Sequence, residues 1–371
     1  MITHKTTLLA ALALSAGAHA ALAADAYPPL ATLPPPPIPV DNPMTADKIE
    51  LGKQLFFDDR LSGNGRMGCA QCHQPYAGWG TGAPISFGYT GNIHWRNSQT
   101  VLNSAYYNKL FWDGAVTSLE TQAPSAAGGG VSGNGDDSMM EMRLAFVPEY
   151  RAAFKKVFGT EYPMIWDAWR AIAAYERTVV TDAKQVPFDR FLAGDKTALS
   201  DAAKRGMDLY NGKAGCIACH NGALASDEKY YRTGVPAARE FSEDPLQQVT
   251  YRWEVYQKGV SEKVYRTAAD DHGLYYVTKR DADIGRWRTP SLRELKWTGP
   301  YMHNGMLETL ADVVDFYDKG GGPGAEKLKP LGLSSAEKKD LVAFLEALSM
   351  DEPLLHDTPT LPKTQPLWTG K

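Results

Sequence analysis

The sequence predicts a mostly α-helical protein built from two similar domains. The first observation is a Cys-x-x-Cys-His motif that occurs at residues 69–73 and again at residues 216–220. The second is a weak internal repeat, because Gly52-Lys-Gln-Leu-Phe56 precedes the first motif and Gly206-Met-Asp-Leu-Tyr210 precedes the second. A repeated unit of this kind indicates a duplicated domain.

The segments that precede the two motifs have the pattern of short amphipathic helices. One begins near Thr45 and the other near Ser200, and both residue types are good helix caps. In each segment a glycine lies one turn before an aromatic residue, which suits close helix packing. We therefore expect equivalent helices in the two domains.

All four cysteines of the chain belong to the two motifs. Four cysteines in an exported protein usually indicate two disulfides. A single Cys-x-x-Cys motif could instead be redox-active or bind zinc. A zinc site would need its ligands gathered at one point, whereas these motifs are far apart in the chain. Cysteine thiols followed directly by histidine are typical of covalent haem attachment, with the histidine as the proximal iron ligand. The predicted ligands are Cys69, Cys72 and His73 for one haem c, and Cys216, Cys219 and His220 for the other. The predicted fold is thus two cytochrome c-like domains, each wrapped around one covalently bound haem c.

The N-terminus has the pattern of a cleavable secretory signal. Lys5 is followed by an apolar run from Leu8 to about Ala18, and small residues then repeat up to Ala23. The run is too short for a membrane anchor, and no later segment is long and apolar enough to span a bilayer. We expect export to the periplasm.

The chain divides into five predicted parts. These are a signal peptide (1–23), a proline-rich segment (24–44), an N-terminal domain (45–190), a C-terminal domain (191–350) and a tail (351–371). The run Leu33-Pro-Pro-Pro-Pro-Ile-Pro39 favours an extended strap or spacer. Helical spacing predicts core helices within 149–191, including Trp166, and a last helix over 335–348. The glycine-rich stretch 128–135 predicts a flexible loop, which either covers a pocket or lies on the surface.

The composition excludes several function classes. The 371 residues are 43% hydrophobic and 22% charged, with a net charge of −4. These values are ordinary for a soluble globular protein and give no basic patch for a nucleic acid.

The sixth ligand of each iron decides between electron transfer and chemistry, because an open iron can bind peroxide or another small molecule. After the signal and the two proximal histidines are set aside, four histidines are left: His94, His272, His303 and His356. Each is more often a surface or hydrogen-bonding histidine than a ligand. Met302 and Met306 are the methionines in a suggestive place.

Several separated motifs resemble those of bacterial di-haem cytochrome c peroxidases and the related MauG enzymes. The longest covers residues 288–305 (Arg-Thr-Pro-Ser-Leu-Arg-Glu-Leu-Lys-Trp-Thr-Gly-Pro-Tyr-Met-His-Asn-Gly), followed by Glu308-Thr-Leu310. Arg96-Asn97, Thr100-Val-Leu-Asn103 and Phe111-Trp-Asp-Gly114 also match. With the two haem motifs, the resemblance extends over about residues 45–350.

The resemblance implies an unusual ligand for the second haem. In that family the ligand lies fourteen residues after the histidine of Pro-Tyr-x-His, and it is methionine in most peroxidases and tyrosine in MauG. From His303 that spacing reaches Tyr317, so this chain is similar to MauG here. Leu310, Val313, Val314 and Tyr317 share one helical face, which would suit a core tyrosine as well as a ligand. A phenolate is anionic and favours ferric iron, so such a haem is suited to storing an oxidising equivalent.

The resemblance also implies roles for other residues. The haem on His73 would react with peroxide, Trp112 would carry charge between the haems, and Gln122 would lie on the distal side of the first haem. Asn97, Thr298 and Pro300 match positions that bind calcium between the domains, the last two through backbone carbonyls. Oxygen ligands of this kind suit calcium.

The chain departs from the family pattern on the distal side. The family usually has a glutamate ten residues after the glutamine, as the acid–base for peroxide cleavage, and this chain has Ser132 there. Asp136, Asp137 and Glu141 could fold back to serve, although solvated charges are the commoner state. The family's distal proline is displaced, with Pro124 nearby, and Tyr89 stands where some resting peroxidases have a capping histidine. The absence of a capping histidine favours an open or weakly ligated first iron.

Two functions follow as expectations. One is a periplasmic oxidoreductase that uses hydrogen peroxide and takes electrons from a small cytochrome, a copper protein or a protein substrate. The other is a di-haem electron-transfer cytochrome of a respiratory or dehydrogenase system. Tyr317 and Gln122 favour the first, and the missing glutamate favours the second.

Overall fold

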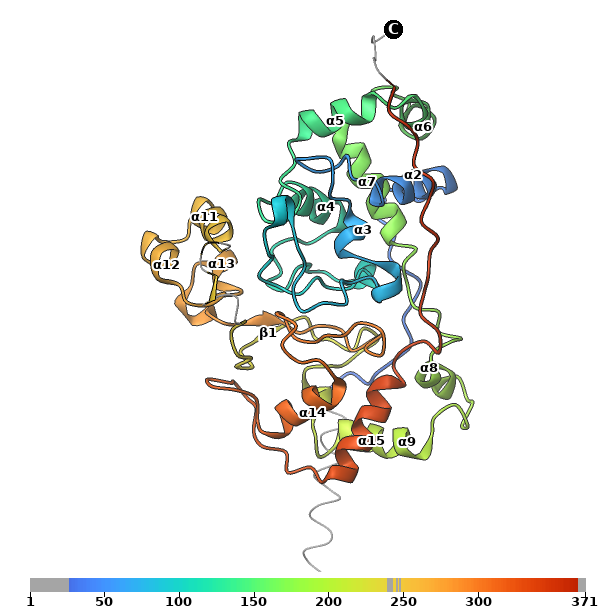
Figure 1. The fold of residues 1–371 in the computed structure, drawn as a ribbon. Helices are drawn as coiled ribbons and strands as arrows, with labels where there is room; N and C mark the ends of the chain where they lie inside the picture. The colour runs from blue at the N-terminus through green and yellow to red at the C-terminus, as the bar shows by residue number, and fades with distance from the viewer. Residues whose placement is uncertain (1–26, 239–242, 245, 247, 366–371) are drawn as a thin grey trace, which may run out of the picture.

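Helices joined by long loops make up the structure, which confirms the mostly helical prediction (Figure 1). The computed structural model describes residues 27–365 except 239–242, 245 and 247. The predicted signal peptide (1–23) lies outside the described residues. In the described part, the β-structure in named strands is one antiparallel pair, β1 (Tyr230–Tyr231) with β2 (Trp287–Arg288), in which Tyr230 lies opposite Arg288.

A first helix pair, α2 (Ala46–Phe56) on α7 (Ile165–Glu176), holds the first haem motif. Thr45 caps α2 as predicted, because its side chain accepts a hydrogen bond from the Lys48 N–H. A Cβ on Gly52 would come 1.9 Å from the Ala171 carbonyl oxygen, so only glycine allows this helix crossing. The first motif follows on the short helix α3 (Cys69–Cys72).

A second helix pair, α9 (Asp201–Asn211) on α15 (Ser335–Glu346), repeats this arrangement. Ser200 caps α9 as predicted. A Cβ on Gly206 would come 2.0 Å from the Asp340 carbonyl oxygen, so the second glycine also permits a close crossing. The second motif begins in a single 3-10 turn, η4 (Cys216–Ala218). The equivalent helices expected from the repeat are confirmed.

The predicted helical region 149–191 consists of three helices, α6 (Pro148–Phe158), α7 and α8 (Pro187–Leu192). Most of the aromatic residues expected in the core are buried there. Trp166 is the exception, since its side chain is 57% exposed and the prediction was wrong for it. It stands beside Ile165 at the start of α7, where a step of one residue turns the side chain about 100° away from the buried face.

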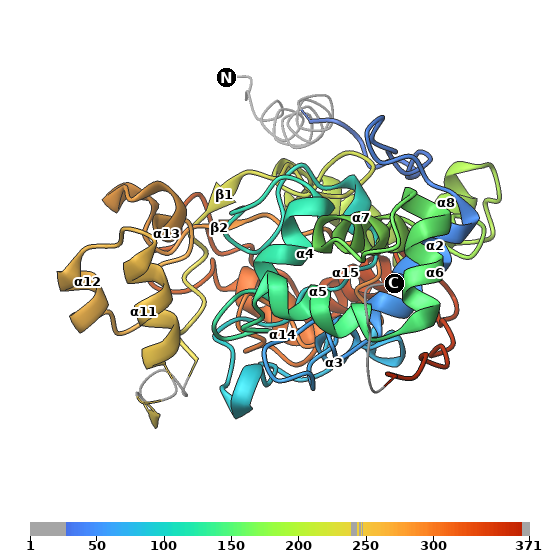
Figure 2. The ribbon, with the colours of Figure 1, turned by 90° about the horizontal axis from the view of Figure 1, so that it is seen from above.

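Three short helices form a separate lobe, which we call the α11–α13 lobe: α11 (Val249–Gln257), α12 (Glu262–Thr267) and α13 (Tyr275–Thr278). Figures 1 and 2 show it projecting to one side of the molecule in both views. Its small apolar core includes Tyr251, Val255 and Tyr276, together with Trp95 and Val131 from the N-terminal half. The lobe is therefore packed against a part of the chain far from it in sequence.

The remaining α-helices are α4 (Leu119–Ala127), α5 (Asp137–Ala145) and α14 (Leu310–Asp318). Residues of α4 and α14 line the space between the two haem motifs, whereas α5 packs against α6 and α7. The described part of the proline-rich segment, residues 27–44, contains no helix or strand. It contacts both halves of the chain, because the Pro34 carbonyl accepts a hydrogen bond from Tyr106 and the Ala31 carbonyl accepts one from Arg293. None of the helices in the described residues combines the length and the apolar character needed to span a bilayer.

Candidate functional site

A large cavity of about 1140 Å³ brings the two haem motifs together. Its walls include all four motif cysteines and both motif histidines. Sites for one small ligand commonly measure about 300–1,000 Å³, so this cavity is larger than one such ligand requires. The walls are predominantly apolar, as a macrocycle of low polarity requires.

The two motif histidines have matching surroundings. The Nδ1–H of His73 donates to the Trp79 carbonyl at 3.2 Å, and the Nδ1–H of His220 donates to the Ala225 carbonyl at 3.2 Å. Since a carbonyl can only accept, the proton of each ring must be on Nδ1. Nε2 is then free to bind a metal, and the hydrogen bond fixes the orientation of the ring. Burial lowers the pKa of both histidines, so both rings are neutral, as iron ligation requires.

The four motif cysteines are free thiols that line the same cavity. Burial raises the pKa of Cys69 and of Cys216 to about 12. No disulfide joins them, and no group of three or more His, Cys, Asp or Glu side chains in the described residues could hold a metal ion. Paired thiols beside a histidine with a free Nε2 fit a covalently bound haem at each motif.

Tyr317 lies in the same cavity, at the second motif. It extends from α14, where Leu310, Val313 and Val314 also line the cavity, so the four residues share a face as predicted. Burial, with smaller effects from Cys216 and Cys219, raises the pKa of Tyr317 well above its usual value. A phenol with a raised pKa would lose its proton only beside a strong positive charge, and a ferric iron would provide one.

Trp112 connects the two halves of the chain. Its Nε1–H donates to the Asn97 carbonyl at 2.9 Å, and its own carbonyl accepts from the Arg288 N–H at 2.9 Å. Its ring centre lies 6.5 Å from that of His303, which stacks on Trp287 at 3.8 Å. From the sequence, His303 was expected only as a possible iron ligand, and Trp287 was not expected at the site. Three rings thus follow one another along the cavity wall.

The distal residues expected near the first motif divide into two groups. Gln122 lines the cavity, and its side-chain amide forms no hydrogen bond with another described residue. Ser132 also lines the cavity, but Asp136, Asp137 and Glu141 are not among the described residues of the wall. Asp136 caps α5, and Glu141 accepts a hydrogen bond from the Ile165 N–H. The suggestion that these acids fold back into the cavity was wrong.

The glycine-rich loop 128–135 is tightly bonded instead of loosely attached. The Ser132 hydroxyl donates to the Ala126 carbonyl at 2.5 Å, and the Ser132 carbonyl accepts from the Tyr89 N–H at 2.7 Å. A Cβ on Gly88 would come 1.7 Å from the Val131 carbonyl oxygen. The loop covers part of the cavity, which is one of the two alternatives for it. Tyr89 takes part through its backbone, and Pro124 lies within α4.

The three residues predicted to bind calcium are brought to one region. The Asn97 N–H donates to the His303 carbonyl at 2.7 Å, and Thr298 and Pro300 precede His303 in the same loop. The Asn97 amide nitrogen donates to the Ala83 and Pro84 carbonyls, so its oxygen is left for another partner. In the described part of the chain no cluster of His, Cys, Asp or Glu could hold a metal. A cation here would need oxygen ligands from the amide and from carbonyls, which suits calcium.

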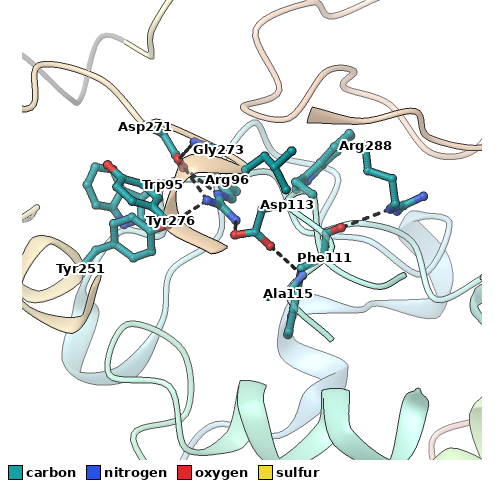
Figure 3. A network of polar contacts seen from close by, with 12 residues as sticks. Trp95, Arg96, Phe111, Asp113, Ala115, Tyr251, Asp271, Gly273, Tyr276 and Arg288 are labelled. Atoms are coloured by element: carbon teal, nitrogen blue, oxygen red, sulfur yellow. Dashed lines mark hydrogen bonds and ion pairs between the residues drawn. The ribbon is translucent and has the colours of Figure 1, made fainter. Parts of the chain in front are cut away.

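A buried ion network fastens the α11–α13 lobe to this region (Figure 3). The Nη1 of Arg96 donates to Asp113 at 2.7 Å, and its Nε and Nη2 donate to Asp271 at 2.7 and 3.0 Å. Nη2 also donates to the Tyr251 hydroxyl at 2.8 Å. The two carboxylates outweigh the cost of burial and raise the pKa of Arg96 further. Arg96 therefore connects the segment that carries Trp112 and Asn97 to the lobe.

Two further residues line the cavity wall: His94, which the sequence offered only as one of four candidate ligands, and Glu254, which was not expected there. His94 is half-buried, and its Nδ1 accepts from the N–H groups of Trp95 and Arg96 at 3.0 and 3.2 Å. Glu254 of α11 accepts from the Gly130 N–H at 3.2 Å. Nothing in the sequence indicates that residue 254 reaches a loop at residue 130, because the contact depends on how the lobe docks.

The comparisons with known proteins agree with this site. Residues 46–197 match the family model described as di-haem cytochrome c peroxidase. The chain is 65% identical to "Cytochrome-c peroxidase IdrP1" of Pseudomonas sp. (strain SCT) over 97% of this chain and 96% of that protein. It is 36% identical to "Methylamine utilization protein MauG" of Methylorubrum extorquens, over 88% and 84% of the two chains.

A solved structure also resembles it. A MauG-like protein associated with microbial copper homeostasis superposes with a TM-score of 0.71 at 30% identity, covering 86% of this chain and 94% of that one. This chain therefore belongs to the di-haem cytochrome c peroxidase and MauG family. It is a haem-dependent oxidoreductase of the peroxidase class, as the resemblance implied.

Proposed function

We propose that this protein is a periplasmic di-haem peroxidase that reduces hydrogen peroxide at an open iron on His73. The observation that supports this is the difference between the two ends of the cavity. Tyr317 lines it at the second motif, whereas Gln122, at the first, has an amide without a partner in the described residues. A free amide can orient a small polar ligand, and a tyrosine can occupy a coordination position.

The proposal gives each residue a role. Cys69 and Cys72 hold one haem and Cys216 and Cys219 the other, within domains at 45–190 and 191–350. His73 and His220 bind the irons through Nε2, and Tyr317 is the second ligand of the haem on His220. The haem groups supply the redox chemistry.

The remaining residues support transfer between the haems. Trp112, in ring contact with His303, carries charge between them. Asn97, Thr298 and Pro300 bind a calcium ion that keeps the two halves together. The electrons come from an external protein, either a small cytochrome or copper protein, or a protein substrate that is itself modified. Export follows from the N-terminal pattern in residues 1–23.

The test is an absorbance titration of the purified holoprotein with hydrogen peroxide. We expect the wild type to show a peroxide-dependent change, and Tyr317→Phe to show a changed spectrum of the second haem with a shorter-lived oxidised state. Tyr76→Phe is the matched control, since Tyr76 is 78% exposed. If peroxide leaves the wild-type spectrum unchanged, the protein is an electron-transfer cytochrome instead. If the second haem is unaffected in Tyr317→Phe, the tyrosine is not its ligand.

A further inference from the structure

We propose that Glu254, from the α11–α13 lobe, is the carboxylate that handles the peroxide proton, in place of the family glutamate that is Ser132 here. The inference rests on the proposed function. It assigns an acid–base residue from a distant part of the chain to the cavity beside His73.

Ser132 itself cannot take this role. Its hydroxyl donates to the Ala126 carbonyl at 2.5 Å and lies 3.3 Å from the Gly129 carbonyl. Its single proton is thus used at the end of α4. A serine hydroxyl also has far too high a pKa to exchange a proton near neutral pH without an activating base.

Glu254 is bound to the same loop, two residues from Ser132. Its Oε2 accepts from the Gly130 N–H at 3.2 Å, and its Oε1 accepts from Lys258. A Cβ on Gly130 would come 3.6 Å from that Oε2 and 3.6 Å from Thr250, so α11 lies directly on the loop. The side chain is 20% exposed and lines the cavity that His73 and Gln122 also line. The Glu254 carboxylate is therefore in contact with both the cavity and solvent, as a residue that exchanges protons must be.

The other carboxyl groups of the wall are less suitable. In the described chain they are Asp113, Glu176 and Glu326. Asp113 and Glu326 are each paired with a cation, as Glu254 is, but neither forms a hydrogen bond to the glycine-rich loop in the described residues. Asp113 accepts from Arg96 at 2.7 Å and, through its other oxygen, from the Ala115 N–H at 3.2 Å, and Glu326 accepts from Arg286 at 3.0 Å. Glu176 lies on α7, where burial raises its pKa to about 8 and keeps it protonated at neutral pH. In the described residues its side chain forms no hydrogen bond with the glycine-rich loop, so it is the rival residue in the test of this proposal.

His94 complements Glu254 but cannot replace it. Two backbone N–H groups point at its Nδ1, so the ring proton must be on Nε2. Burial, and then the charge of Arg96, lower the pKa of His94 to about 4, with Glu254 acting in the opposite direction. His94 is thus a neutral donor that can hold a peroxide oxygen, and it has no free lone pair with which to take a proton.

The proposed step is a proton relay. With haem bound at His73, the Glu254 carboxylate, directly or through one water, would take the proton from one peroxide oxygen and return it to the other. The protonated oxygen would leave as water with the electron pair of the O–O bond, and the haem would supply the two electrons that this cleavage needs. Two electrons from the donor protein, with two protons, would complete the reduction of hydrogen peroxide to two waters. A positioned acid–base of this kind contributes about 10²- to 10⁴-fold to a rate.

The test is stopped-flow mixing of the holoprotein with hydrogen peroxide. We expect Glu254→Gln to slow the peroxide-dependent absorbance change by about 10²-fold or more. Haem content and carbon monoxide binding to the reduced protein should stay as in the wild type. Glu262→Gln is the control, because Glu262 forms a similar i,i+4 pair with Arg266 on the same lobe but is exposed. Adding Ser132→Glu to Glu254→Gln should restore part of the rate, since it returns the carboxylate to the family position.

The outcomes separate the two proposals. A wild-type protein that does not react with peroxide overturns the proposed function. A wild type that reacts, together with a Glu254→Gln variant that reacts as fast, overturns only the role of Glu254. If Glu176→Gln loses the rate while Glu254→Gln keeps it, the proton is handled from α7 instead.

Discussion

The two helix pairs hold their haem motifs in the same way, but the cavity around the motifs differs. In each pair a glycine crosses a partner helix at a backbone carbonyl, at Ala171 in α7 and at Asp340 in α15. Four residues later each partner helix carries an aromatic residue, Tyr175 or Phe344, against the glycine helix. The scaffold is thus repeated closely enough for residues to be matched one by one.

The first difference between the two helix pairs is the residue that follows each of these aromatic side chains. Glu176 follows Tyr175, Leu345 follows Phe344, and both line the cavity. Glu176 is buried with one carboxyl oxygen that has no partner in the described part of the chain. The second difference is Tyr317, which has no counterpart at the first motif. The helices that carry the two motifs are thus alike, whereas the polar side chains differ between the two ends of the cavity.

The largest expected effect comes from removing one haem at a time. Cys69→Ala with Cys72→Ala should abolish the peroxide-dependent absorbance change, because the reacting iron would no longer be held. Cys216→Ala with Cys219→Ala should leave a reaction with peroxide but shorten the life of the oxidised state. Rapid-mixing spectra of both proteins, after haem quantification, provide the measurement. Equal losses in the two variants would mean that the two sites are not functionally distinct.

The attachment of the lobe should matter next. Arg96→Met leaves Asp113 and Asp271 buried without a cation, which typically costs about 3–5 kcal/mol. We expect this loss in the free energy of unfolding, together with a slower reaction with peroxide if the lobe carries Glu254. Arg266→Met, in an exposed pair, should change neither. Denaturant unfolding measures the first quantity, and an Arg96→Met protein as stable as the wild type would contradict the network.

The repeated helix crossings should respond alike to substitution. Gly52→Ala and Gly206→Ala would each force a methyl group onto a backbone carbonyl, at a cost of about 1–3 kcal/mol. Asp208→Ala, on the exposed face of α9, is the control and should have little effect. Thermal unfolding of the three variants provides the comparison. A large loss at one glycine only would show that the two crossings are not equivalent.

The smallest expected effect is a pH dependence of the free energy of unfolding, which we expect from Glu176 and not from Leu345, its counterpart in the second helix pair. Burial raises the pKa of Glu176 to about 8 from 4.5, so between these values the folded state keeps a proton that the unfolded state releases. Stability therefore falls as the pH rises through this window, by about 1 kcal/mol per pH unit. Glu176→Gln removes this dependence, whereas Leu345→Met should preserve it. Denaturant unfolding at pH 6 and pH 7 would test this, and parallel changes in wild type and Glu176→Gln would contradict it.

Much of the framework could be predicted because it depends on local patterns. The caps at Thr45 and Ser200, the last helix and the shared face of Tyr317 follow from spacing within about one or two helical turns. The motif histidines could also be identified, since their chemistry requires neighbouring cysteines. Trp166 was misplaced because a helical period alone does not show which neighbour covers a given face.

Glu254, which we propose as the acid–base, could not be identified from the sequence for a different reason. Closeness in the chain to Ser132 indicates only residues such as Asp136 and Glu141. Glu254 reaches Gly130 only because the lobe docks through Arg96. The two aspartate partners of Arg96, Asp113 and Asp271, are themselves far apart in the sequence. Contacts of this kind depend on the tertiary fold and leave no periodic signal.

The C-terminal segment beyond residue 350 has a consequence for the order in which the protein folds. It returns along the N-terminal half, as the red ribbon beside α2 and α6 in Figure 1 shows. Leu354 accepts a hydrogen bond from the Trp79 indole, His356 bonds to the Tyr175 hydroxyl, and Pro362 accepts from Arg60. These contacts join residues that lie 181 to 302 positions apart in the chain. The N-terminal half therefore reaches its final packing only after the C-terminal segment has been synthesised.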